Sequence, residues 1–318
     1  MSLLKRSLVL TFTLLFAATA VQIASAQRPP TPRGSQKSTV AQTVGTTDIS
    51  ITYSRPAVKG RAVYGDWPAE AKGEGTLDNQ NTRPAGAPLV PWGHVWRTGA
   101  NEATLFVVND DVLINGQPLA AGKYSLHSIP AKDDWTFIFN KDDGQWGSFS
   151  YDATKDVLRV KAKPTWVGDS QELLTFVVDA PEGDSATVNL RWEKLSVPFT
   201  VKVKDVTGST LVRLRAYAAA AKADEFQQPF NAAMWAKQNK QDADAATWFA
   251  QAEKAVDAAI AAKPTFGNYR AKSNILFNAG KAQPALAATE KAIELGKAEK
   301  ADVAALEKRA ADLKAGKM

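Results

Sequence analysis

The residue pattern changes abruptly at position 205, and this change constrains the fold more than any other feature of the 318-residue chain. Before it, short runs alternate apolar and polar residues; in 47–53, Ile49, Ile51 and Tyr53 are separated by polar side chains. This period of two is typical of a half-buried β-strand. After it, 33 of 113 residues are alanine, and apolar positions recur at helical spacing. The pattern predicts a β domain over 38–205 and a helical domain over 206–318.

The β domain is predicted to be an all-β antiparallel sandwich, either jelly-roll or immunoglobulin-like, because many short strands follow one another with turn residues between them. Asn115-Gly116 is the strongest hairpin signal, since both residue types accept the positive φ angles of a two-residue turn. Besides 47–53, strands are predicted at 103–108, 111–114, 122–129, 135–140, 157–163, 172–178, 186–192 and 197–203.

The C-terminal region is predicted to consist of helical hairpins. The segment EKAVD at 253–257 returns as EKAIE at 290–294, an offset of 37 residues. This spacing, with small alanines at packing positions, is similar to tetratricopeptide-type (TPR-like) hairpins, and a plain helical bundle is the alternative. Helices are predicted at 211–222, 229–238, 243–262, 265–279, 284–296 and 301–314.

The first 26 residues are predicted to be a cleaved signal peptide. Lys5 and Arg6 precede an apolar stretch at 8–18, and residues 24–26 (ASA) fit the small-residue pattern of a cleavage site. The apolar stretch is shorter than a bilayer-spanning helix needs, so no membrane span is expected after cleavage. A Pro-rich leader at 27–37 is predicted to be flexible. The mature protein is therefore expected to be periplasmic or secreted.

Composition excludes several kinds of site. The chain has no cysteine, which excludes disulfides and thiolate metal sites. Its formal net charge of +6 comes mostly from residues 206–318, which carry +5, while residues 27–205 carry −1. No segment has the concentrated Lys/Arg stripe that nucleic-acid binding requires. The two histidines are too few to predict a metal site without several carboxylates. We predict no nucleic-acid partner, no metal and no cofactor.

Three segments carry a recognisable pattern. Residues 53–65 read YSRPAVKGRAVYG, residues 95–104 read VWRTGANEAT, and residues 122–130 read GKYSLHSIP. Together they resemble the bacterial domain of unknown function 2911, over about 38–203. The resemblance implies an exported β-rich domain followed by a helical tail, and it implies no established activity and no catalytic residues. The sequence departs from the family pattern at an insertion, 71–88, which is predicted to be disordered.

The motif residues suggest a ligand pocket. Arg97 presents a planar fork suited to a carboxylate or phosphate, and Trp96 would supply an aromatic floor. The alternative is a buried Arg97–Glu102 ion pair that fixes the turn and binds nothing. No catalytic residue is assigned. The candidate ligand-binding residues are Arg55, Lys59, Arg61, Tyr64, Trp92, Trp96, Arg97, Asn101 and Glu102.

Three functions are compatible with these observations. The first is a non-enzymatic binding module. Its β domain recognises a polar or anionic ligand, such as a glycan or an anionic small molecule, or an envelope partner, and its helical tail engages a protein partner. The second is a glycan-acting hydrolase or lyase with Glu102 as general acid or base, which requires a second carboxylate in the same pocket. The third is a purely structural envelope scaffold. We favour the binding module.

Overall fold

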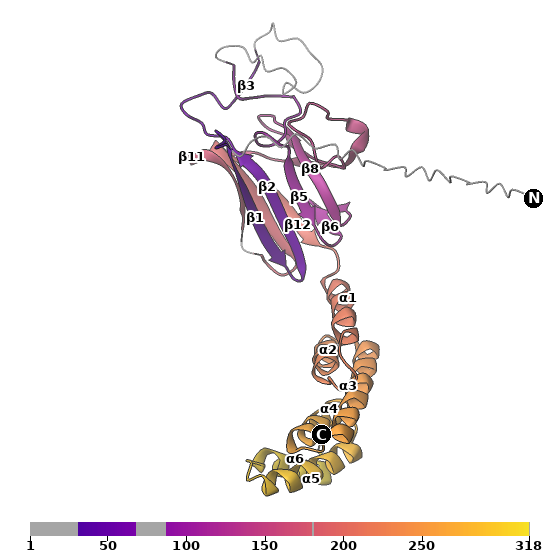
Figure 1. Cartoon of the computed structure of the whole chain (residues 1–318). Coiled ribbons are helices and arrows are strands. Elements are labelled where there is room, and N and C mark those ends of the chain that lie inside the picture. Colours follow the sequence, from indigo (N-terminus) through magenta and orange to yellow (C-terminus); the bar gives the residue numbers. More distant parts are fainter. Residues whose placement is uncertain (1–30, 68–86, 180, 318) are drawn as a thin grey trace, which may run out of the picture. The chain divides into compact units, whose positions relative to one another are not determined.

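The computed structural model describes residues 31–67, 87–179 and 181–317 (Figure 1). Antiparallel sheets occupy residues 36–203, and helices follow between 206 and 314. This confirms the predicted order of an antiparallel β domain and a helical region. The predicted signal peptide and most of the insertion at 71–88 lie outside the described residues.

Two sheets build the β domain. The first has the strand order β1-β2-β5-β8-β9-β10, and the second has the order β11-β12-β6-β7. A short parallel pair, β3 (Tyr64–Gly65) with β4 (Val90–Pro91), brings together the segments that flank residues 68–86. The first sheet contains β1 (Gln36–Val44), β2 (Thr47–Arg55), β5 (Thr104–Val108), β8 (Gly122–Ile129), β9 (Trp135–Asn140) and β10 (Asp156–Ala162), and the second contains β6 (Val112–Ile114), β7 (Gln117–Leu119), β11 (Thr165–Val178) and β12 (Ser185–Val203).

The apolar core lies between the two sheets. Ile49 and Ile51 of β2 are fully buried, as the period of two predicts. Phe137 of the first sheet and Phe199 of the second have ring centroids 4.9 Å apart, so side chains of both sheets interlock. Because the chain has no disulfide, this burial of apolar surface is the main force that holds the sheets together.

The strand predictions are largely confirmed, including the hairpin at Asn115-Gly116, whose residues have φ angles of 47° and 80°. β12 runs unbroken through the two strands predicted at 186–192 and 197–203. It carries a bulge at Glu193, which has a φ of 53° and interrupts the register with β11. β1 was not predicted, because it is an edge strand with few buried positions and therefore a weak apolar pattern. It begins at Gln36, inside the predicted leader.

Helices form the rest of the described chain. The same turn joins α2 to α3, α4 to α5 and α5 to α6, with Lys240, Gly280 and Lys300 in the left-handed region. α2 and α4 begin at 227 and 266, and α3 and α5 begin at 242 and 282, so the structural repeat is 39 or 40 residues rather than 37. The repeated EKA segments are thus about one helical turn out of structural register. The helices are α1 (Val206–Ala219), α2 (Gln227–Gln238), α3 (Asp242–Ala262), α4 (Phe266–Asn278), α5 (Ala282–Ala298) and α6 (Ala304–Lys314).

The helical region begins directly after β12. The Asp205 carboxylate accepts a hydrogen bond from the Gly208 amide at 2.8 Å and caps α1. Arg213 of α1 pairs with Asp110, which follows β5, with an N–O distance of 2.7 Å. No helix among the described residues is long and apolar enough to cross a membrane.

Candidate functional site

The motif at 96–104 forms a tightly bonded turn before β5. Trp96 exchanges main-chain hydrogen bonds with Ser128 of β8, at 2.7 and 2.8 Å. Thr98 and Asn101 have φ angles of 53° and 62°, which few non-glycine residues adopt. The Thr98 hydroxyl donates to the Ser128 hydroxyl at 2.9 Å, and the Thr104 hydroxyl donates to the Thr98 carbonyl at 2.8 Å. Main-chain and side-chain hydrogen bonds together therefore fix this turn against β8.

Arg97 and Asn101 connect this turn to its neighbours. Arg97 Nη1 donates to the Asn101 carbonyl at 2.7 Å, and Asn101 Nδ2 donates to the Ser35 carbonyl at 2.9 Å. The guanidinium carbon of Arg97 lies 5.9 Å from the centre of the Phe149 ring. One terminal nitrogen of the Arg97 guanidinium is thus bonded to the protein backbone.

Glu102 lies at the edge of the turn. It forms a β-bridge with Trp146, and the Ala103 amide donates to the Gln145 carbonyl at 3.0 Å. Its carboxylate is 3.9 Å from Lys37 Nζ of β1, and its side chain is 34% exposed. Glu102 therefore remains accessible to a ligand.

The basic residues of the first motif contact the second sheet or their own loop. Arg55 donates to the Leu174 carbonyl at 2.9 Å and to the Thr175 hydroxyl at 2.5 Å. Arg61 donates to two carbonyls of its own turn, and the Lys59 amide donates to the Glu172 carboxylate at 2.9 Å. These contacts tie the segment that follows β2 to β11.

The predicted aromatic residues pack together at one end of the core. Tyr64 stacks on Trp92 with ring centroids 5.4 Å apart, and Trp96 stacks on Trp192 at 6.0 Å. Trp96 is 6% exposed, and its indole N–H donates to the Gly99 carbonyl. Burial raises the pKa of Tyr64 well above its ordinary value, because the phenolate would be desolvated. In these positions Tyr64 and Trp96 serve packing.

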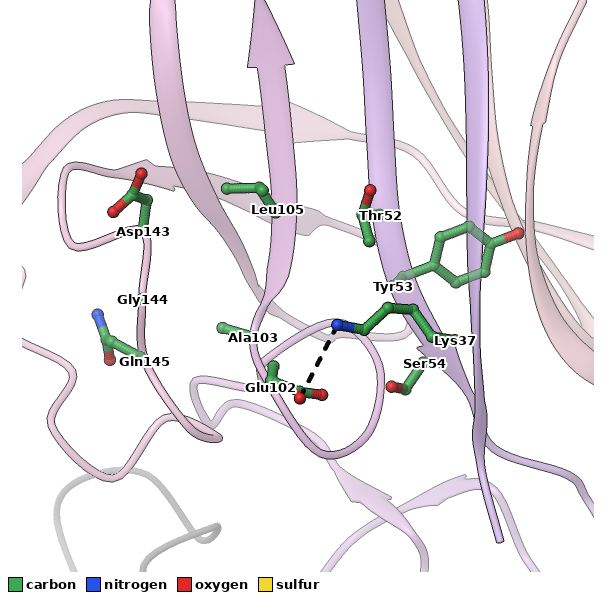
Figure 2. Close-up of a pocket in the computed structure, with 10 residues that line it drawn as sticks. All are labelled: Lys37, Thr52, Tyr53, Ser54, Glu102, Ala103, Leu105, Asp143, Gly144 and Gln145. Atoms are coloured by element: carbon green, nitrogen blue, oxygen red, sulfur yellow. Dashed lines mark ion pairs between the residues drawn. The ribbon is translucent and has the colours of Figure 1, made fainter. Parts of the chain in front are cut away.

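A small cleft lies beside the motif turn, next to residues of β1, β2 and β5 (Figure 2). Its volume is about 160 Å³. Figure 2 shows Asp143 and Gln145 on one side, Thr52 and Ser54 on the other, and Leu105 between them. Of the nine predicted site residues, Glu102 lines this cleft and the other eight do not. The full lining is Lys37, Thr52, Tyr53, Ser54, Glu102, Ala103, Leu105, Asp143, Gly144 and Gln145.

Two buried polar atoms of the cleft lack a partner. Ser54 is 2% exposed and Gln145 is 6% exposed, yet neither Ser54 Oγ nor Gln145 Oε1 forms a hydrogen bond with any described residue. A buried polar atom without a partner costs about 1–3 kcal/mol. Both atoms belong to residues that line the cleft, and the described protein groups leave them unsatisfied.

Sequence reasoning missed most of this cleft. Ser54 lies inside the first motif, at 53–65, and this is the sequence signal that could have indicated it. Lys37, Asp143 and Gln145 lie outside all three motifs. No group of three or more His, Cys, Asp or Glu side chains in the described segments is placed to hold a metal.

The chain thus consists of a two-sheet antiparallel β domain with a small cleft beside a hydrogen-bonded turn, followed by an array of short helices. Residues 35–201 match the model of the family described as "Protein of unknown function (DUF2911)". The match covers more than half of the chain, and the protein belongs to this family, as its motifs indicate. No curated protein and no solved structure matches the chain.

Proposed function

We propose that the protein is a non-enzymatic binding module whose β domain holds a hydroxyl-rich neutral ligand, such as a sugar ring of a glycan, in the cleft beside Glu102. The observation that carries this proposal is the pair of buried, unpartnered atoms, Ser54 Oγ and Gln145 Oε1, on residues that line the cleft. A hydroxyl group both donates and accepts hydrogen bonds, so neighbouring hydroxyls satisfy a serine and an amide oxygen together.

The charge of the cleft favours a neutral ligand over an anion. One cation, Lys37, faces two carboxylates, Glu102 and Asp143. Lys37 is already close to Glu102, which leaves little positive potential for an anionic group. Of the two small-molecule classes compatible with the sequence, a glycan therefore fits this cleft better than an anion.

The size of the cleft limits the ligand. A cavity of about 150 Å³ accepts a guest the size of one six-membered ring, and typical ligand pockets are larger. The 160 Å³ cleft thus suits a single sugar ring or the end of a chain.

The proposal is tested by titrating the protein with glucose, galactose and N-acetylglucosamine, and separately with inorganic phosphate, while backbone amide shifts are recorded. We expect a neutral sugar to shift the amides of Ala103 and Gln145, with an affinity in the millimolar range. Gln145→Met removes the unpartnered oxygen and should weaken binding by about tenfold. Gln117→Met, at an exposed position on β7, is the matched control. Binding of phosphate alone, or equal effects of the two substitutions, would contradict the proposal.

The hydrolase or lyase is the second candidate, because Asp143 is a second carboxylate that lines the same cleft as Glu102. Most glycosidases use a pair of carboxyl groups as catalytic residues. Incubation with bacterial cell-wall glycan and polysaccharides should then release new chain ends, and Glu102→Gln should abolish the release. If neither ligand nor product is found, the scaffold function is the remaining choice.

The location and the helical region complete the proposal. The signal-peptide pattern supports export to the periplasm or the medium, which N-terminal sequencing of the native protein tests by finding Gln27 first. The TPR-like helical array is proposed to engage a protein partner, with no cofactor and no nucleic acid involved.

A further inference from the structure

A cleft in the helical region carries an excess of positive charge. It has a volume of about 510 Å³ and lies beside Phe277 of α4 and one face of α6. Its charged residues are Lys308, Arg309, Asp312 and Lys317. The Asp312 carboxylate is 2.6 Å from Lys308 Nζ, so the carboxylate of the lining is already paired.

Arg309 is held in this cleft by neutral groups. Its Nη1 donates to Ser273 Oγ at 3.0 Å and to Asn274 Oδ1 at 2.5 Å, and its guanidinium carbon lies 5.0 Å from the centre of the Phe277 ring. Within the described segments no carboxylate lies within ion-pair distance of Arg309, and no residue accepts a hydrogen bond from its Nε or Nη2. Burial lowers the pKa of Arg309 from its ordinary value, because no counter-charge offsets the loss of water.

Buried hydroxyls orient this arginine. Ser273 and Thr289 are fully buried, with their hydroxyl oxygens 2.6 Å apart. The Thr289 hydroxyl can also donate to the Ala285 carbonyl, which leaves Ser273 Oγ to accept from Arg309. In a core made mostly of alanine, these polar groups are tolerated because they are hydrogen-bonded to one another and to the backbone. Its effect is to fix a cation at the side of an open cleft.

We propose that this cleft binds the carboxylate of an acidic peptide segment of a partner protein. The free edge of the Arg309 guanidinium matches a carboxylate with two parallel hydrogen bonds. Lys308 and Lys317 add charge around it, and Phe277 offers an apolar surface to a neighbouring peptide side chain. The volume exceeds what a single small anion fills. This inference deepens the proposed partner binding of the helical region and does not involve the cleft beside Glu102.

The test is calorimetric titration of the full chain with acetyl-Leu-Asp-Asp and with its neutral counterpart, acetyl-Leu-Asn-Asn amide. We expect the acidic peptide to bind and the neutral one to bind at least about tenfold more weakly, because a charge-assisted bidentate contact is lost. Added salt should weaken the binding of the acidic peptide, since the lysines around the cleft are exposed. Inorganic phosphate serves as a third probe.

Two variants locate the binding. Arg309→Gln should reduce affinity for the acidic peptide at least about tenfold. Because this change also removes the contacts to α4, Lys308→Gln with Lys317→Gln provides a second variant that leaves those contacts intact, and it should weaken binding in the same direction. Lys254→Gln with Lys263→Gln removes two exposed lysines outside the cleft and should leave affinity unchanged.

The outcomes are distinct. Equal binding of the acidic and neutral peptides, equal affinity of the cleft variants and the control, or binding of phosphate without the peptide would overturn the assignment. Sugar binding to the β domain is measured with different probes and a different variant, so failure of one proposal is distinguishable from failure of the other.

Discussion

Arg97 Nη1 and the main-chain carbonyl of Asn101 are 2.7 Å apart and hydrogen-bonded, and the same carbonyl accepts a hydrogen bond from the Gly147 amide at 2.9 Å. A motif side chain and the connection between β9 and β10 therefore meet at one oxygen atom. That connection also supplies Asp143 and Gln145 to the cleft. The contact links the rigidity of the motif turn to the shape of the proposed binding site.

Replacing Arg97 with Met should lower the free energy of unfolding by about 1–3 kcal/mol, because the Asn101 carbonyl loses a charged donor. Urea unfolding measures this loss. An unfolding free energy equal to that of the wild type would contradict this role of Arg97.

Asn101→Val should destabilise the β domain more than Asn101→Gly. Both changes remove the hydrogen bond to Ser35, but valine must also adopt a φ of 62°, which costs a side chain with a Cβ about 1–2 kcal/mol. Thermal unfolding of the two variants compares them directly. Equal stabilities would mean that the backbone of this turn relaxes when Asn101 is lost.

Acid should weaken the structure through Asp110. Burial alone would raise the pKa of Asp110, but hydrogen bonds from Arg213 and Thr47 and the charge of Arg213 outweigh it and hold this pKa below its ordinary value. The ionised carboxylate therefore adds stability above the unfolded-state pKa of about 3.9, and this is lost as the pH falls through the folded-state pKa.

Urea unfolding of the wild type and Asp110→Asn at neutral pH and at decreasing acidic pH tests this prediction. The wild type should be the more stable at neutral pH, and the difference should shrink as the pH falls. A constant difference across that range would show that Asp110 does not contribute through its charge.

Gly296→Ala should destabilise the helical region although alanine is the better helix former. A Cβ at this position would lie 2.6 Å from a Val303 methyl group and 2.9 Å from the Phe266 ring. Gly267→Ala in α4 is the matched control, because its Cβ would meet just one atom, at 3.8 Å, and it should raise stability by up to about 1 kcal/mol. Calorimetry that found Gly296→Ala as stable as Gly267→Ala would contradict this view of the packing between α4, α5 and α6.

A fragment of residues 27–205 should unfold cooperatively, because the sheets share a core of their own. We expect the denaturation midpoint of the fragment to lie below that of the full chain. The fragment lacks Val206, which packs on that core, and Arg213, which pairs with Asp110. Chemical denaturation followed by tryptophan fluorescence checks both points. A fragment without a cooperative transition would mean that the helices complete the β domain.

The candidate site was predictable only in part. The motif contains Glu102 and the turn beside the cleft, because clustered polar residues beside positive-φ positions are visible in sequence. The opposite wall of the cleft was not predictable, since Asp143 and Gln145 are far from the motif in sequence and reach it through a β-bridge between Glu102 and Trp146. Arg55 and Arg61 resembled ligand cations, but their acceptors are backbone carbonyls and a threonine hydroxyl.

The antiparallel β domain, the helical region after it and the family can all be inferred from sequence, because periodicity, turn residues and motifs are local properties of the chain. Which polar groups line a cleft and which bond to other protein groups becomes visible in the folded structure alone. Arg55, Arg97 and Arg309 have the same side chain, but their environments differ. Arg55 and Arg97 donate to backbone carbonyls, whereas Arg309 lines an open cleft. The physical reason is that a side chain's partners come from distant segments, and folding alone brings those segments together.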